Sequence, residues 1–321
     1  MHIPDTLLQG AVCPITAVMS SIGLAAAVVA AAKSDNKPTP MTFGTVAALI
    51  FAGQMLNFPL VGGTSGHLLG GVLAVSLLGV PFGVLAMGLV VLVQCLVFAD
   101  GGIASLGSNL LNMALIAPVV GGVFLSVVAR HGKTGPIVRS VLLAGAAWLS
   151  VMLAAFAVSV ELAAAGRIAL ATASQAMLSV HALIGIGESL ITVAAFWLLV
   201  PLRRYGLDKR RSLLSLALVV ALALMLSPLA SSLPNGLEWV AARYHLFLPS
   251  VAGFEGLVSG YVLPNIDHPY VTTVLAGMVG AAVVFSFAWL LARQFKRRHC
   301  SSPSSFDASF SPRIRSDSCL R

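Results

Sequence analysis

The chain has 321 residues, of which 58% are hydrophobic and only 9% are charged, and its mean hydropathy is +0.96. A soluble domain carries about a quarter charged residues, so this composition excludes an ordinary soluble protein and indicates one that lies in a membrane. The formal net charge of +8 does not indicate nucleic-acid binding, because most of the basic residues fall in loops on one side of the expected membrane spans.

Nine apolar stretches are candidates for membrane-spanning helices, since about 20 helical residues cross a hydrocarbon core of about 30 Å. In chain order they cover residues 12–32, 41–57, 66–80, 82–99, 105–129, 137–160, 174–200, 212–230 and 271–292. The third stretch is short and rich in glycine, which is typical of a broken or re-entrant element. The sequence therefore predicts an all-α, polytopic helical membrane protein with about seven spans followed by a two-span C-terminal hairpin.

The basic segment PLRRYGLDKRRS, residues 201–212, separates the first seven spans from the last two. We place a domain boundary there, which gives a membrane domain over 1–205 and a two-helix unit with an outer loop over 206–298. Residues 299–321 are rich in serine, proline and charge, and we expect a disordered cytoplasmic tail. Basic residues follow spans one, five, seven and nine, so the positive-inside rule places the N-terminus outside and the C-terminus in the cytoplasm.

A histidine stands directly after the first methionine. Because methionine is normally kept before a residue of this size, we expect a free amine at Met1 beside the amide and imidazole nitrogens of His2. On a metal ion the first two nitrogens close a five-membered ring and the last two a six-membered ring. Divalent nickel, copper or cobalt favours such a set, and one further nitrogen would complete a square plane. The alternative is that His2 is an ordinary residue of a frayed terminus.

The segment NFPLVGGTSGHLLGG, residues 57–71, breaks the helical pattern with proline and glycine. Non-helical backbone at membrane depth is tolerated where protein or a water-lined cavity covers it. His67 begins the next apolar run and is the candidate for the fourth nitrogen, although a packing role is an equal alternative. Asn57, Thr64 and Ser65 are candidates for residues that support this site or gate it.

Two further segments carry polar residues within or beside apolar spans, where such residues are expected to be buried. In FADGGIASLGSNLLNM, residues 98–113, Asp100 precedes a Gly-Gly turn, and Asn109 should point inward because an amide in lipid is costly. Both are candidates for support of a metal-bound imidazole, or for contacts between helices. In HALIGIGESLIT the spacing of seven puts His181 and Glu188 on one helix face. They can order a cavity, bond neighbouring helices or relay protons, and the structural role is favoured.

Together, MHIPD, NFPLVGGTSGHLLGG, FADGG…LGSNLLNM and HALIGIGE resemble the CbiM/NikM family over residues 1 to about 205. These are the substrate-binding membrane subunits of cobalt and nickel energy-coupling-factor (ECF) transporters. The resemblance implies that the metal is held by the Met1 amine, the His2 amide and imidazole, and the histidine matching His67. The family often reads MHIPDG at its start, and here Thr6 replaces the glycine.

The expected C-terminal hairpin has a resemblance of its own. SSLPNGLEWVA, residues 231–241, is similar to the PDGLE motif of the CbiN/NikN-like accessory component that is fused to the main subunit in some members. Asn235 stands where the motif has aspartate, so a direct acidic role is not expected there.

The resemblance implies the substrate-capture (S) component of an ATP-driven ECF transporter that imports Ni(II) or Co(II) across a bacterial or archaeal cytoplasmic membrane. The chain contains no Walker A loop. This chain is therefore not expected to hydrolyse ATP. The resemblance implies that CbiO/NikO-like ATPase subunits do so, joined through a CbiQ/NikQ-like transmembrane coupling subunit. We expect a transporter subunit rather than an enzyme, with the metal as cargo and no catalytic cofactor. The expected partners are these subunits and the lipid membrane, and no nucleic acid.

Two other functions remain as alternatives. Ser65 in Gly-Thr-Ser-Gly, with His181 as its base, would form the dyad of a rhomboid-like intramembrane serine protease. An ion-coupled secondary metal permease would use Asp100, Glu188 and His181 as a relay, although no internal repeat supports it.

Overall fold

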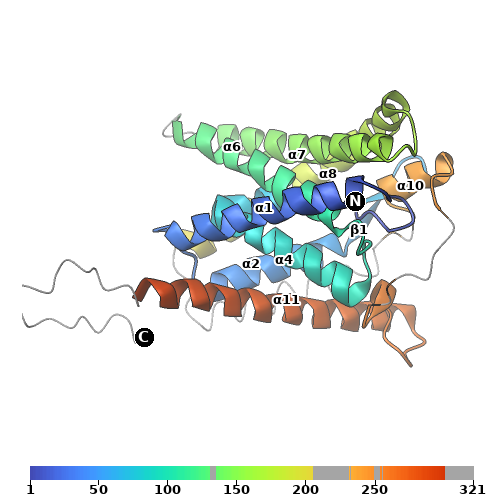
Figure 1. Ribbon diagram of the computed structural model, residues 1–321. Helices are drawn as coiled ribbons and strands as arrows, with labels where there is room; N and C mark the ends of the chain where they lie inside the picture. The colour runs from blue at the N-terminus through green and yellow to red at the C-terminus, as the bar shows by residue number, and fades with distance from the viewer. Residues whose placement is uncertain (131–134, 205–230, 232, 249–253, 255, 301–321) are drawn as a thin grey trace, which may run out of the picture.

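The computed structural model describes residues 1–130, 135–204, 231, 233–248, 254 and 256–300 (Figure 1). Its elements are α1 (Val12–Lys33), α2 (Pro40–Gln54), β1 (Asn57–Leu60), β2 (Thr64–His67), α3 (Gly71–Leu78), α4 (Val80–Phe98), α5 (Leu106–Asn109), the π-helix η1 (Leu110–Ile116), α6 (Ala117–Arg130), α7 (Pro136–Ala164), α8 (Leu170–Arg204), α10 (Gly236–Arg243), the 3₁₀-helix η3 (Ser259–Tyr261) and α11 (Pro269–Cys300).

Within the described residues, six helices are long and apolar enough to cross a membrane. They cover Val12–Lys33, Val80–Phe98, Leu106–Arg130, Pro136–Ala164, Leu170–Leu199 and Pro269–Phe295. The expected polytopic helical membrane protein is confirmed. The expected span at 212–230 and the expected disordered tail, apart from the end of α11, lie outside the described residues.

The second and third expected spans are shorter than the apolar pattern indicated. Helix α2 has 15 residues and α3 has 8, because the chain between them forms a β-hairpin instead of continuing as helix. The strands β1 and β2 are antiparallel, and Asn57 lies opposite His67 in their register. The helix-breaking segment is therefore a small two-stranded element within an otherwise helical fold.

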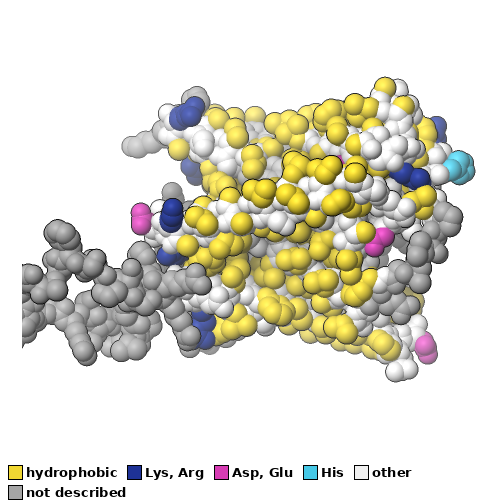
Figure 2. Space-filling view, viewed as in Figure 1, with side chains coloured by type: hydrophobic (Ala, Val, Ile, Leu, Met, Phe, Trp, Pro, Cys, Tyr) yellow, Lys and Arg dark blue, Asp and Glu magenta, His cyan; other side chains and the backbone are white. Residues whose placement is uncertain are grey.

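The long helices run side by side and form an elongated body (Figure 1). Helices α7 and α8 pack against each other along their length, and α11 packs against α2 and α4. The N-terminus, β1 and α10 lie at one end of this body, and α11 ends at the opposite end. Figure 2 shows a mainly hydrophobic surface between two ends that carry the charged side chains, which is the pattern that a bilayer requires.

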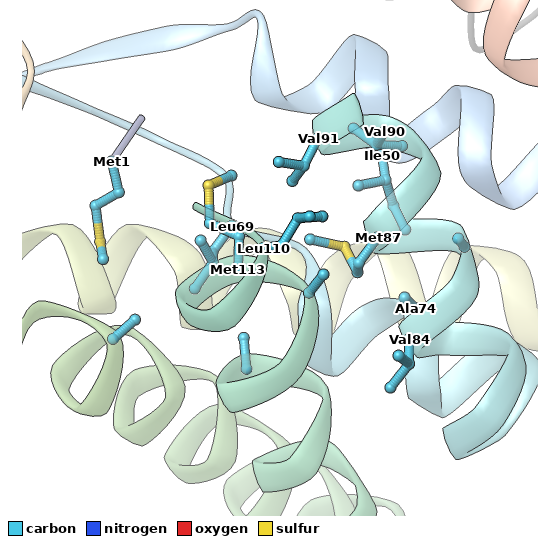
Figure 3. Close-up of a cluster of buried hydrophobic side chains, with 14 of the residues drawn as sticks. Met1, Ile50, Leu69, Ala74, Val84, Met87, Val90, Val91, Leu110 and Met113 are labelled. Carbon is cyan, nitrogen blue, oxygen red and sulfur yellow. The ribbon is translucent and has the colours of Figure 1, made fainter. Parts of the chain in front are cut away.

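The N-terminal segment belongs to the core. Met1 is only 6% exposed, and Ile3, Leu7 and Leu8 are fully buried. Figure 3 shows the Met1 side chain within the same buried apolar cluster as Leu69. The first residues are thus packed under neighbouring elements rather than frayed.

Candidate metal-binding site

Three nitrogen-bearing groups meet in one buried cluster at the hairpin end of the molecule. The Met1 amine donates a hydrogen bond to Nε2 of His67. The His67 Nδ1–H donates to the carbonyl oxygen of Leu68 at 3.0 Å, so the lone pair of the neutral ring is on Nε2. The His2 and His67 rings are stacked, with centroids 5.6 Å apart and planes inclined by 21°. The structure therefore brings together the three residues expected from the sequence.

The contacts of the His2 ring identify which of its nitrogens can bind a metal. Nε2 lies 3.0 Å from the carbonyl oxygen Oε1 of Gln94 and donates to it, which leaves the lone pair on Nδ1. Nδ1 is the nitrogen that can close a six-membered chelate ring with the His2 amide. It lies 3.3 Å from Oδ1 of Asp100, so a carboxylate stands beside the position that a cation would take.

Burial keeps the nitrogens of this cluster in their neutral forms. It lowers the pKa of the Met1 amine to about 6, although Asp100 acts in the opposite direction. Burial also lowers the pKa of His2 and holds the pKa of His67 well below its ordinary value. Because amine and imidazole ligands must be unprotonated to bind a metal, these lone pairs are available near neutral pH.

The backbone of Ile3 is held by the segment that follows α4. Its amide N–H donates to Oδ1 of Asn109 at 2.8 Å, and its carbonyl accepts from Nδ2 of Asn109 at 3.1 Å. The same carbonyl accepts from the Ser105 hydroxyl at 2.5 Å and from the Gly102 amide at 2.9 Å. Asn109 thus acts on the site by fixing the terminus rather than by touching an imidazole.

A second set of hydrogen bonds holds the N-terminal segment at Asp5, two residues after Ile3. The Asp5 carboxylate accepts from the backbone amides of Ile103 and Ser105, both at 3.1 Å. A Cβ at Gly102 would overlap the Asp5 carboxylate, so this close approach requires glycine. The hydrogen bonds at Ile3 and Asp5 together hold the N-terminal segment in position next to His67.

Glu188 secures the backbone just after His67. Its carboxylate is fully buried in α8 and accepts from the amides of Leu69 at 2.6 Å and Gly70 at 2.8 Å. The residue therefore positions the turn that joins β2 to α3. Asp100 and Glu188 bond different segments, so the relay expected of a secondary permease is not assembled from these contacts.

Thr64 and Ser65 join the β1–β2 hairpin to the C-terminal unit by hydrogen bonds. The Thr64 hydroxyl donates to the carbonyl of Pro234 at 3.1 Å, and the Ser65 hydroxyl donates to the carbonyl of Leu233 at 2.8 Å. Asn57 contributes in the same way, because its carbonyl accepts from the Ser231 amide at 2.7 Å. The C-terminal chain thus lies along the strands that carry His67.

The protease dyad is not formed. The Ser65 hydroxyl is engaged with a backbone carbonyl, and the Nδ1–H of His181 donates to the carbonyl of Met177 at 2.7 Å. Nε2 of His181 has no hydrogen-bond partner among the described residues. Serine and histidine therefore lack the hydrogen bond that would activate a nucleophile.

The C-terminal unit also contacts Asp100, the carboxylate beside the terminal cluster of Met1, His2 and His67. The Tyr261 hydroxyl donates to Oδ2 of Asp100 at 2.7 Å, while its ring stacks on Phe98 with centroids 4.6 Å apart. Asn235 caps α10, because its side chain accepts from the Leu237 and Glu238 amides. Asparagine thus caps the helix N-terminus as the aspartate of the PDGLE motif could.

Sequence reasoning missed Gln94 and Tyr261. Gln94 was detectable in principle, since a polar side chain inside an apolar span marks a functional candidate. Tyr261 carried no such mark, because it lies in a loop whose position depends on tertiary contacts. In the part of the chain that the structure describes, no three His, Cys, Asp or Glu side chains gather as a metal site.

A polytopic helical fold that buries neutral nitrogen atoms beside a carboxylate is the arrangement expected of a membrane component of metal transport. Residues 2–205 match the CbiM family, described as the cobalt uptake substrate-specific transmembrane region, and the chain belongs to this family. Residues 209–297 match the PDGLE domain. The resemblance found in the sequence is thus confirmed, and the chain is a cobalt or nickel transport component of the CbiM/NikM type rather than an enzyme.

Individual relatives agree with this assignment. A protein of Archaeoglobus fulgidus named as a fused nickel transport protein, NikMN, is 35% identical over 302 residues, which cover 91% of this chain and 98% of the relative. The fused nickel transport protein LarMN of Lactiplantibacillus plantarum is 31% identical, covering 87% of this chain and 92% of its own. A crystal structure of a truncated transition metal transporter superposes with a TM-score of 0.55 at 28% identity, covering 63% of this chain and 99% of that one.

Proposed function

We propose that this chain is the substrate-capture subunit of an ATP-driven ECF transporter that imports Ni(II) or Co(II) across a bacterial or archaeal cytoplasmic membrane. The observation that carries the proposal is the buried contact between the Met1 amine and Nε2 of His67, with the His2 ring stacked beside it. The names of the relatives, which refer to nickel and cobalt transport, support the choice of cargo.

In the proposed complex the metal takes four nitrogens: the Met1 amine, the His2 amide, Nδ1 of His2 and Nε2 of His67. The first three form two fused chelate rings, and His67 closes the plane. The amide nitrogen binds only after losing its proton, which adds negative charge to the ligand set. Such nitrogen-rich planar sets suit Ni(II) and related divalent ions. Asp100, 3.3 Å from Nδ1 of His2, partly balances the remaining positive charge.

We propose that the metal enters from outside the cell. Helices α1 and α6 end in Lys33 and Arg130, and both helices end on the side of the molecule opposite to the N-terminus (Figure 1). The positive-inside rule favours the cytoplasm for that side, which puts the terminal cluster toward the outer face. The energy for import is proposed to come from CbiO/NikO-like ATPases acting through a CbiQ/NikQ-like coupling subunit, because the chain has no phosphate-binding loop of its own.

The ligand assignment is tested by Ni(II) titration of purified protein with an unextended N-terminus. We expect His67→Ala to abolish tight binding and His268→Ala, at an exposed histidine outside the cluster, to leave it unchanged. A single glycine added before Met1 should be nearly as damaging as His67→Ala, because it replaces the buried amine with an amide. Binding of wild-type strength by the extended protein would show that the amine is not a ligand.

A further inference from the structure

His181 is prepared as a ligand in the same way as His67. In each ring Nδ1 donates to a backbone carbonyl, that of Leu68 for His67 and that of Met177 for His181. This leaves the lone pair on Nε2, the nitrogen that then binds metals. The His181 side chain is fully buried, and its Nε2 has no hydrogen-bond partner among the described residues. A histidine that served packing alone would bury this acceptor at a cost that a phenylalanine avoids.

The unpaired nitrogen belongs to a residue that lines a cavity shared with the terminal cluster. The cavity has a volume of about 10 Å³, and its walls include Met1, His67 and His181. That volume suits one small occupant such as a water molecule or a single metal ion. Asn235 and Gly236 of the C-terminal unit complete the wall. A Cβ at Gly236 would lie 3.0 Å from Cε1 of His181, so the start of α10 rests directly on this ring.

Contacts along α8 show that His181 is nearer than His67 to the end of the molecule that carries the N-terminus, which is the outer end in the proposed orientation. Glu188 bonds the amides of Leu69 and Gly70, and a Cβ at Gly66 would touch Ile184 at 3.0 Å. His67 therefore lies at a level between Ile184 and Glu188. His181 is one helical turn before Ile184, under α10, and α10 lies at the same end of the molecule as the N-terminus (Figure 1).

We propose that His181 is a second metal ligand, which holds the incoming Ni(II) or Co(II) in this cavity before the ion reaches the Met1–His2–His67 cluster. The inference rests on the proposed function. In this proposal the C-terminal unit covers the His181 position through Gly236.

The transfer is a ligand exchange. The bond between the metal and Nε2 of His181 breaks as the bond to Nε2 of His67 forms, and water ligands leave as the chelating nitrogens bind. Both imidazoles are neutral and keep their Nδ1 protons on backbone carbonyls, so no proton moves between them. The only proton lost is that of the His2 amide, which is released to water when the amide nitrogen binds the metal.

The test compares His67→Ala with the double variant His67→Ala/His181→Ala in unextended protein loaded with Ni(II). X-ray absorption should count one more imidazole on the metal in the single variant than in the double variant. Removing His181 should weaken the residual binding of the single variant by roughly 10- to 100-fold. In the wild-type background His181→Ala should keep the bound-metal stoichiometry and final spectrum but load Ni(II) several-fold more slowly than His268→Ala.

Identical imidazole counts and affinities in the single and double variants, or wild-type loading by His181→Ala, would overturn the role of His181. His181→Gln is the substitute if the alanine variant does not fold, since the amide can occupy the site without providing an imidazole. Failure of the proposed function looks different, because wild-type protein would then bind no metal at all or bind equally well with an added N-terminal residue.

Discussion

Replacing Tyr261 with phenylalanine removes one hydroxyl from the C-terminal unit and leaves the ring in place. The ring can keep its stacking on Phe98, at 4.6 Å between centroids. What is lost is the 2.7 Å hydrogen bond to Oδ2 of Asp100, whose other oxygen faces Nδ1 of His2 at 3.3 Å. We therefore expect Tyr261→Phe to weaken metal binding without contact between this residue and the metal.

The size of the effect follows from the role of Tyr261 as a support. Loss of a residue that holds the surroundings of a metal ligand in place costs roughly 10- to 100-fold in affinity. The Asp100 side chain is 29% exposed, so water can replace part of the lost bond, and the low end of that range applies. We expect the Ni(II) affinity of Tyr261→Phe to fall by about tenfold, or about 1.4 kcal/mol.

The assay is Ni(II) titration calorimetry on wild type, Tyr261→Phe, Asp100→Asn and the double variant, with Tyr244→Phe as the matched control. Tyr244 is 37% exposed and lies outside the cluster. If Tyr261 acts through Asp100, its substitution should add little in the Asp100→Asn background. Additive effects of the two substitutions, or an affinity unchanged in Tyr261→Phe, would refute this reasoning.

Three further predictions concern the support of the cluster and its protons. Asn109→Ala removes both side-chain bonds to Ile3 and leaves a buried amide unpaired, so we expect a loss of about 1–3 kcal/mol in unfolding free energy together with weaker Ni(II) binding. An unchanged Tm and titration would contradict this. Glu188→Gln deprives one of two backbone amides of its acceptor and should lower the Tm, whereas an equal Tm would show that the clamp is dispensable. With the pKa of the Met1 amine lowered from 8.0 to about 6, Ni(II) binding should release about one proton, from the His2 amide, between about pH 7 and 8. That number should rise through about one and a half near pH 6 toward about two below it, and about two protons at pH 7 would contradict the burial of the amine.

The candidate ligands Met1, His2 and His67 could be predicted from the sequence because short local patterns mark them. Met1 and His2 are adjacent, and the Pro- and Gly-rich segment before His67 marks a non-helical element at membrane depth. The long spans were predictable for the same reason, since an apolar run of sufficient length has few alternatives in a bilayer. The β-hairpin was not predicted as such, because four-residue strands such as Thr64–His67 carry no periodicity that separates them from a loop.

The support of the cluster depends on contacts between distant segments. Tyr261 reaches Asp100 across 161 positions of sequence, and the Ser65 hydroxyl reaches Leu233 across 168. In a single sequence, neither residue of such a distant pair indicates which residue it contacts. His181 was a candidate from its place in the sequence, but the contact of its ring with Gly236 is visible only in the structure. Sequence patterns thus indicated the candidate ligands, and the three-dimensional structure was needed to find what holds and covers them.

The most direct test of the central claim is the absorption spectrum of Ni(II)-loaded protein that carries an unextended N-terminus. Four nitrogens in a plane from Met1, His2 and His67 should give a yellow, diamagnetic species at one Ni(II) per chain. A paramagnetic spectrum typical of six-coordinate Ni(II), or protein that purifies without binding the metal, would contradict the proposed site.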